Sequence, residues 1–195
     1  MQGLCVVIEP LKFIMEEQAQ KLRAQQIPAF YFNSSLTDTE MDYIVNAICR
    51  QDFPYVMLFT GPECILSRRL QYVLETWNKS ERLSFIAVDE AHCIDLWGHG
   101  FCPDFLKLGT LKDYKVPLMA LTSTATERAQ SKIISCLNLH EPKTILVKHA
   151  RINLFLKVIP KNAKPKKQVA DFLSTVIVLV NVELFTVHEE RMLLI

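Results

Sequence analysis

The stretch Leu83-Ser84-Phe85-Ile86-Ala87-Val88-Asp89-Glu90-Ala91-His92 decides the fold of this chain. A continuous apolar run that ends at once in paired acids is typical of a buried parallel strand that finishes at a site. Ligands of open α/β sheets bind beyond the carboxyl ends of the strands, so Asp89 and Glu90 occupy a position where chemistry is expected. An Asp there can hold a nucleotide-bound Mg²⁺, and a neighbouring Glu can orient or deprotonate water. Taken alone, the two acids could equally be turn residues.

Segments of strand and helix character alternate on both sides of this stretch. The sequence predicts strands at 4–8, 29–32, 55–59, 83–88, 118–121, 144–148 and 154–159. It predicts helices at 11–25, 37–50, 67–78, 103–112 and 124–137. Two of these helices open with capping boxes, at Thr37-Asp38-Thr39-Glu40 and Thr124-Ala125-Thr126-Glu127. Strands that alternate with helices of this length indicate βαβ units and a parallel sheet.

The residues after His92 carry a more specific signal. Cys93-Ile94-Asp95-Leu96 leads into Trp97-Gly98-His99-Gly100-Phe101-Cys102-Pro103-Asp104-Phe105. This run resembles the aromatic-rich loop of RecQ-family DNA helicases, where Asp-Glu-Ala-His-Cys precedes Trp-Gly-His-Asp-Phe-Arg-Pro and an acid–aromatic pair. Further stretches resemble motifs of that family in the same order: Pro10-Leu11 with Met15 and Gln18, Thr60-Gly61-Pro62-Glu63, Leu121-Thr122-Ser123-Thr124-Ala125-Thr126, and Arg151-Ile152-Asn153-Leu154. The resemblance extends from about Gly3 to Val158.

The resemblance implies an α/β fold, a three-layer RecA-like parallel sheet of the P-loop NTPase type. It implies that Asp89 holds Mg²⁺ through the nucleotide, that Glu90 orients water, and that His92 links the nucleotide site to neighbouring motifs. Thr122, Ser123 and Thr124 are implied to couple hydrolysis to domain movement. The residues implied to contact DNA are Trp97, His99, Phe101, Phe105, Arg151 and Asn153. The implied activity is ATP-dependent 3′-to-5′ DNA unwinding, with ATP and Mg²⁺ as cofactors and single-stranded or forked DNA as partner.

The chain also departs from the family pattern. With only five glycines, it contains no Gly-x-x-x-x-Gly-Lys-Ser/Thr, the loop whose backbone N–H groups and lysine cradle phosphates. We therefore expect an incomplete sheet without the P-loop strand, and no second motor domain. In the aromatic loop, Gly100 stands where the family has an acid, Cys102 where it has an arginine, and Asp95-Leu96 where it has a Ser/Cys-Gln pair. Loss of the arginine removes a phosphate-binding fork, so weak coupling of DNA binding to ATP hydrolysis is expected.

The candidate residues have simpler structural interpretations as well. Thr124 could cap the following helix, which is compatible with a coupling role. Trp97 and Phe101 could be core aromatics, and Phe105 is expected to pack in part. A tryptophan on a glycine-flanked loop nevertheless favours base stacking, which contributes ~1–3 kcal/mol per base.

Histidines and cysteines near the acids raise the question of a metal site. His92, Cys93, His99 and Cys102 have the chemistry of zinc ligands, but their spacing matches no standard structural zinc pattern. Adjacent His92 and Cys93 would strain to bind one ion, so no zinc site is predicted. The six cysteines form no Cys-x-x-Cys pair and no secretory signal is apparent, so reduced thiols in the nucleus, or in a prokaryotic cytoplasm, are expected.

Composition limits the classes of function. A chain of 195 residues with 50% hydrophobic content can bury one sizeable core. Because the net charge is only +1, DNA binding must depend on a local site. The apolar run near the carboxyl terminus is interrupted by Asn181 and Glu183 and is shorter than the ~20 residues a membrane helix requires, so no membrane association is expected.

The sequence predicts three regions: a partial helicase ATP-binding domain at 1–159, a basic linker at 160–168 and a divergent tail at 169–195. Two functions from different classes follow. One is the ATP-binding part of a RecQ-like helicase that acts in DNA unwinding, repair and recombination. The other is a catalytically inactive module that binds single-stranded DNA weakly, or that modulates an intact helicase or another DNA-repair protein. An incomplete gene model of an ordinary helicase is a third interpretation.

Overall fold

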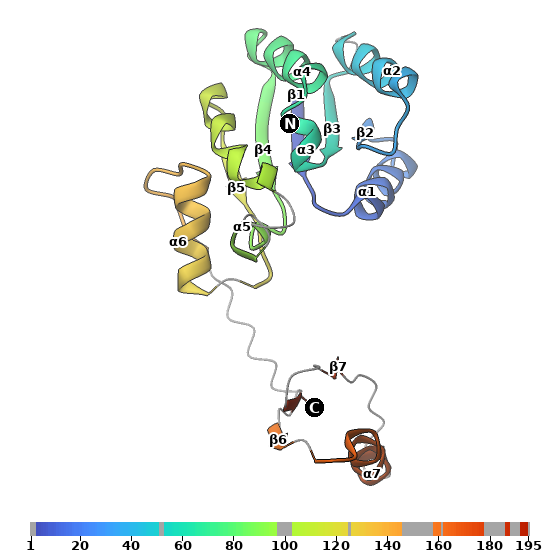
Figure 1. Ribbon diagram of the computed structural model, residues 1–195. Helices are drawn as coiled ribbons and strands as arrows, with labels where there is room; N and C mark the ends of the chain where they lie inside the picture. The colour runs from blue at the N-terminus through green and yellow to red at the C-terminus, as the bar shows by residue number, and fades with distance from the viewer. Residues whose placement is uncertain are drawn as a thin grey trace. The chain divides into compact units, whose positions relative to one another are not determined.

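The computed structural model describes residues 3–50, 53–96, 103–124, 126–145, 158–160, 162–177, 186–187 and 192–194. The chain divides into two compact units, Met1–Lys143 and Thr144–Ile195. The boundary between them falls earlier than residue 159, where the sequence suggests the end of the first domain. Figure 1 shows that the first unit is a sheet flanked by helices.

A five-stranded parallel sheet forms the centre of the first unit, with the spatial order β2-β3-β1-β4-β5. Its strands are β1 (Gly3–Ile8), β2 (Ala29–Phe32), β3 (Tyr55–Thr60), β4 (Leu83–Val88) and β5 (Leu118–Ala120). The helical segments are α1 (Lys12–Ala24), α2 (Asp38–Cys49), α3 (Pro62–Ile65), α4 (Arg68–Lys79), α5 (Cys93–Leu96), the 3₁₀ helix η1 (Pro103–Tyr114) and α6 (Glu127–Cys136). The predicted α/β class and the parallel sheet are confirmed.

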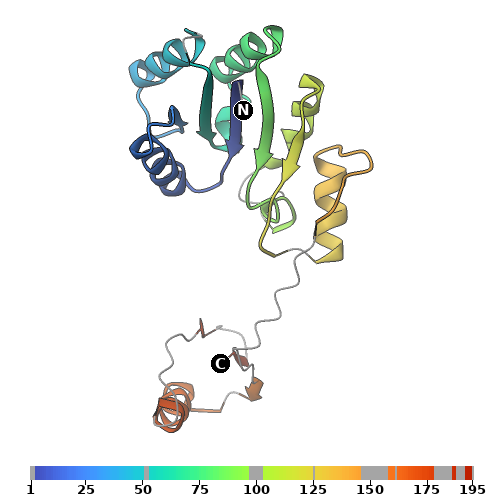
Figure 2. The same ribbon diagram turned by 180° about the vertical axis from the view of Figure 1, so that it is seen from behind.

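The helices cover the two faces of this sheet unequally. After β1, the chain crosses over the position of β3 to form β2 at one side of the sheet. It then moves in the opposite direction, forming β3, β4 and finally β5 at the other side. Because parallel crossovers are right-handed, α1 lies on one face, whereas α2, α4 and η1 lie on the other. Packing agrees, since Met15 and Ala19 of α1 form a small cluster with Ala29 and Phe59, and a much larger cluster fills the opposite face. Figure 2 shows β1, β4 and β5 from the α1 side, where no described helix lies over them.

Local sequence explains where two of the helices begin. The Thr37 hydroxyl accepts the Glu40 N–H at 3.3 Å, and the Glu40 carboxylate accepts the Thr37 N–H at 2.8 Å, which is the predicted capping box of α2. The second predicted box is wrong. The N-cap of α6 is Thr126, whose hydroxyl accepts the Ala129 N–H at 3.2 Å, so Thr124 precedes the helix rather than capping it.

Two further segments differ from prediction. The segment expected as an α-helix from residue 103 is the 3₁₀ helix η1. Its buried side chains, Phe105, Leu108 and Leu111, recur every third residue, which matches the three residues per turn of a 3₁₀ helix. Residues 144 and 145 form no strand, and the remainder of the predicted strand at 144–148 lies outside the described residues.

The second unit contains a small antiparallel sheet and one helix. The sheet has the order β6-β8-β7, and the elements are β6 (Val158–Pro160), α7 (Pro165–Ile177), β7 (Thr186–Val187) and β8 (Met192–Leu194). Helix α7 begins inside the segment expected as a linker, with Pro165 in the first turn, where a missing N–H removes no helical hydrogen bond. Among the described residues, no helix is long and apolar enough to span a membrane.

Candidate active site

Polar side chains gather at the edge where the five strands end. The buried polar or charged side chains of the described residues are Glu9, Asn33 and Thr60, with exposed fractions of 2%, 0% and 0%. Glu9 follows β1, Asn33 follows β2, and Thr60 ends β3. Asp89 and Glu90 follow β4 at the same edge. Because burial of a polar group costs free energy, their gathering at one edge indicates that this edge is the functional one.

A tight turn after β4 presents the two acids. The Asp89 N–H donates to the Ile8 carbonyl at 2.8 Å, which anchors the turn beside the end of β1. The Asp89 carboxylate accepts the Glu90 N–H at 2.8 Å. Glu90 has a φ of 47°, in the left-handed region that non-glycine residues adopt at a cost in free energy. The Ala91 N–H donates to the Leu121 carbonyl at 2.8 Å, so the turn is also held by the end of β5.

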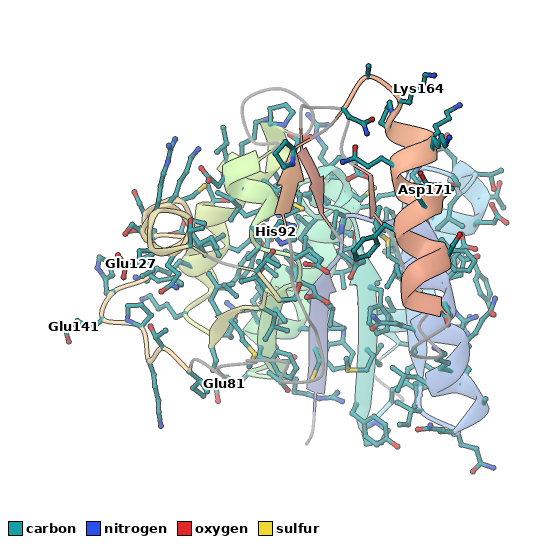
Figure 3. All side chains as sticks on the ribbon, turned by 90° about the horizontal axis from the view of Figure 1, so that it is seen from below. Glu81, His92, Glu127, Glu141, Lys164 and Asp171 are labelled. Carbon is teal, nitrogen blue, oxygen red and sulfur yellow. The ribbon has the colours of Figure 1, made fainter. Side chains whose placement is uncertain are left out.

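His92 connects this turn to the segment after β5. Its Nδ1 lies 3.0 Å from Thr122 Oγ1 and 3.1 Å from Glu90 Oε2, but only the contact with Thr122 has hydrogen-bond geometry. Thr122 Oγ1 donates its proton to the Thr124 carbonyl at 3.0 Å. Nδ1 of His92 is therefore the donor to Thr122, and in the neutral ring Nε2 is left as an acceptor. Figure 3 views the sheet from the end at which its strands finish and shows His92 there.

Glu9 is a residue of this edge that the sequence interpretation missed. It directly follows β1, whose neighbour β4 leads into Asp89. Burial raises the pKa of the Glu9 carboxyl to about 7; the Leu11 N–H, 3.4 Å from Oε1, opposes this rise, and the negative charges of Asp89 and Glu90 add to it. A signal was present in the sequence, because Glu9 follows an apolar run just as Asp89 does.

The structure brings some of the predicted site residues together at one edge of the sheet. Those that lie at the carboxyl edge are Asp89, Glu90, His92, Thr122, Ser123 and Thr124. Phe105 is 0% exposed in the core, in line with the expectation that it packs, and its contact with DNA stays a prediction. The predicted DNA-binding residues that lie outside the described part of the chain are Trp97, His99, Phe101, Arg151 and Asn153.

The oxygen atoms of this edge fit a magnesium-bound nucleotide. Mg²⁺ is usually held by one or two carboxylates, with phosphates and water as its other ligands. Glu90 Oε2 is a buried carboxylate oxygen with no hydrogen-bond partner among the described groups. Within the described residues, no cluster of three or more His, Cys, Asp or Glu side chains could hold an ion unaided. Of the residues weighed as zinc ligands, Cys93 is 1% exposed in the core, and His99 and Cys102 lie outside the described residues.

Comparison with known proteins identifies the family. The sequence model of the DEAD/DEAH box helicases matches residues 1–133. The matched region contains all five strands of the sheet together with the turn after β4 and the segment after β5. The chain belongs to the DEAD/DEAH box helicase family. This assignment is consistent with the placement of the Asp-Glu-Ala-His sequence at the carboxyl edge.

Within this helicase family, the chain is of the RecQ type. It is 36% identical over 172 residues to the RecQ-like DNA helicase BLM of Xenopus laevis. The aligned region covers 87% of this chain and 12% of that protein. It is 35% identical over 173 residues to the ATP-dependent DNA helicase RecQ of Pasteurella multocida, covering 88% of this chain and 26% of that protein. The chain thus spans well under half the length of these helicases. The helicase domain of Pyrococcus furiosus Hef aligns with 70% of this chain and 28% of that chain, at a TM-score of 0.43 and 16% identity.

Proposed function

We propose that this chain forms the nucleotide-binding part of the first motor domain of a RecQ-type DNA helicase that unwinds DNA in the 3′-to-5′ direction. The observation that carries the proposal is the connection between two strand ends. The acids after β4 and Thr122 after β5 are joined by the 3.0 Å hydrogen bond from His92 Nδ1 to Thr122 Oγ1. The relatives named as ATP-dependent DNA helicases support ATP as the nucleotide and DNA as the substrate.

Each residue of this edge has its own role in the proposed mechanism. Asp89, held by the bond from its N–H to Ile8, would hold the Mg²⁺ of the nucleotide. When bound, Mg²⁺ neutralises charge that develops on the phosphates. Glu90 orients the attacking water, a role that suits a carboxylate whose Oε2 has no hydrogen-bond partner among the described groups. His92 lies within 3.1 Å of both Glu90 and Thr122, so it transmits a change at the nucleotide to the segment after β5.

The 195-residue chain by itself is proposed to be inactive. Phosphoryl transfer requires a phosphate cradle, a metal and a charge-stabilising arginine together, and this sequence contains no Gly-x-x-x-x-Gly-Lys-Ser/Thr loop. This observation favours the second candidate function, a module that binds single-stranded DNA weakly or modulates an intact helicase or another DNA-repair protein. In a eukaryotic cell, either function places the chain in the nucleus.

DNA binding is proposed to depend on the aromatic loop around Trp97. Base stacking needs no net positive protein, which suits a chain with a net charge of +1. We expect Trp97→Ala to weaken binding of a fluorescent single-stranded oligonucleotide by ~1–3 kcal/mol. Tyr43→Ala, which removes an aromatic side chain that is 71% exposed on α2, is the matched control and should have no effect. Equal affinity for duplex DNA, or indifference to Trp97→Ala, would contradict the proposal.

ATP hydrolysis tests the proposed motor function in two proteins. The isolated chain should show no turnover above background, with or without single-stranded DNA. A chimera in which this chain replaces the matching segment of Pasteurella multocida RecQ receives the other parts of the motor from that protein and should hydrolyse ATP. Turnover should disappear with Glu90→Gln, and DNA should stimulate it little because Cys102 stands in place of an arginine. A folded chimera without turnover would overturn the proposed motor function, whereas turnover by the isolated chain that Glu90→Gln abolishes would overturn its proposed inactivity.

A further inference from the structure

We propose that Asp95 and Lys132 are positioning residues that hold His92 in place against Thr122. Lys132 Nζ donates to Asp95 Oδ1 at 2.9 Å, and the two side chains are only 28% and 19% exposed. The inference rests on the proposed function, because that function gives His92 its role between the nucleotide and the segment after β5. It concerns two residues to which the family resemblance assigns no role, because Asp95 stands where the family has Ser or Cys.

The ion pair joins the two segments that carry the site. Asp95 lies on α5, which begins one residue after His92, and its N–H donates to the His92 carbonyl at 3.0 Å. Lys132 lies on α6, the helix that follows Thr122. Figure 1 shows α5 beside α6, and the two helices are in contact. A displacement of Asp95 therefore acts directly on the backbone of His92, while Lys132 holds Asp95 to the β5 side of the site.

Among the lysine and arginine ion pairs of the described residues, this pair is the least exposed. The Lys107–Asp104 and Lys79–Glu75 pairs each lie within one helical segment, and their lysines are 63% and 78% exposed. Asp95–Lys132 connects two separate helices. The Arg69 pairs with Asp38 and Asp42 do so too, but those acids are 84% and 59% exposed, whereas the partial burial of Asp95–Lys132 reduces screening by water and salt. Loss of this pair thus removes a tertiary constraint beside the His92–Thr122 hydrogen bond, whereas loss of Lys107–Asp104 removes only a local contact.

The test reads the site directly in the full 195-residue chain, without DNA or nucleotide. Asp95→Asn and Lys132→Gln are compared with the unaltered chain by nitrogen–proton spectra of the histidine rings, with His92→Gln to identify the signals of His92. We expect both variants to shift the His92 signals. Amide exchange of Ala91, whose N–H donates to the Leu121 carbonyl, should become about fivefold faster. Asp104→Asn is the matched control and should alter neither measurement.

A charge reversal separates positioning from a general structural effect. The double variant Asp95→Lys with Lys132→Asp retains the attraction and should restore both the His92 signals and the exchange rate of Ala91. Unchanged signals and exchange in the single variants would overturn the proposal, and so would a charge-reversed protein that is unfolded or unrestored. Because these measurements involve no ATP, their failure is distinct from failure of the proposed function, which hydrolysis by the chimera reports.

Discussion

The two edges of the central sheet are built in different ways. At the amino edge, backbone hydrogen bonds close the structure: the Gly3 N–H donates to the Pro54 carbonyl at 2.8 Å, and the Leu4 N–H donates to the Arg82 carbonyl at 2.7 Å. The Arg82 guanidinium also lies 4.5 Å from the centre of the Trp77 ring, which is 1% exposed. These contacts stabilise the fold and include no buried acid, although the buried Trp77 Nε1 has no hydrogen-bond partner among the described groups and Glu81 has a φ of 56°.

The carboxyl edge carries features that cost stability. Glu9 is buried with a pKa raised to about 7, and Glu90 is held at a φ of 47°. The side-chain nitrogen of buried Asn33 has no hydrogen-bond partner among the described groups. Strain and imperfectly satisfied polar groups concentrate at functional sites, where other parts of the fold offset their cost. Left-handed residues and an unsatisfied buried nitrogen occur at both edges, so the difference between the edges lies in their acids: Glu9 is buried at the carboxyl edge beside Asp89 and Glu90, whereas the amino-edge contacts include no buried acid.

The largest expected effect is at the amino edge. Trp77→Ala removes a buried ring from α4 and its contact with Arg82, so we expect the free energy of unfolding to fall by ~3–5 kcal/mol in denaturant titrations. Tyr72→Ala on the same helix removes a ring that is 57% exposed and should cost less than ~1 kcal/mol. Similar losses of unfolding free energy in the two variants would contradict the claim that the contacts of Trp77 stabilise the amino edge of the sheet.

At the carboxyl edge, we expect a substitution to increase stability. Because the pKa of Glu9 is raised from 4.5 to about 7 in the folded chain, its contribution to stability is present below pH 4.5 and lost as the pH rises to about 7. Glu9→Gln imitates the protonated side chain, so its stability should equal that of the unaltered chain at about pH 4.5 and exceed it by ~2–3 kcal/mol at pH 8. Unfolding curves at the two pH values provide the measurement.

The control for this comparison is Glu63→Gln, which alters an exposed acid of α3 near the same edge and should retain the pH dependence of the unaltered chain. A Glu9→Gln variant that is less stable than the unaltered chain at pH 8 would show that the buried carboxylate is well accommodated. The buried Glu9 carboxylate would then not lower the free energy of unfolding.

The smallest effect separates a helix cap from the site beside it. Thr126→Ala removes the N-cap of α6 and should lower the free energy of unfolding by ~1 kcal/mol. Thr124→Ala should change it by less than ~0.5 kcal/mol, because Thr124 bonds Thr122 through its backbone N–H and carbonyl alone. If thermal or denaturant unfolding showed a larger loss of stability for Thr124→Ala than for Thr126→Ala, Thr124 would be the cap of α6 instead.

Sequence alone was sufficient for the five strands of the parallel sheet and for the turn after β4. The apolar run of β4 and the acids that follow it determine both, because a buried parallel strand has few alternatives. The assignment of a strand at 154–159 to the same unit was wrong, because residues 158–160 form β6 of the antiparallel sheet in the second unit. The cap of α6 was predicted wrongly since both Thr124 and Thr126 have capping chemistry, and the choice depends on the bonds between Thr122 and Thr124. These bonds require the end of β5 to be in place, which local pattern does not show.

Phe105 and Glu9 differ in how far the sequence alone predicts their surroundings. The resemblance implied that Phe105 contacts DNA, whereas the residues themselves predicted packing, and the three-residue spacing with Leu108 and Leu111 accounts for its complete burial. Glu9 resembled an ordinary turn acid because its proximity to Asp89 depends on the pairing of β1 with β4. Sequence thus identified the five strands of the parallel sheet and the acids Asp89 and Glu90, but not the short helices α3 and α5, and the place of Glu9 required the order of the strands.

ATP hydrolysis by the Pasteurella multocida RecQ chimera tests the central claim most directly, with one glutamate altered at each edge. Glu90 follows β4 at the carboxyl edge, and Glu81 is an exposed residue that precedes β4 at the amino edge. Glu90→Gln should reduce turnover by at least ~100-fold, because a residue that orients or deprotonates water contributes that much. Glu81→Gln should leave turnover unchanged. Equal activity of the two variants would contradict the assignment of the carboxyl edge as the nucleotide site.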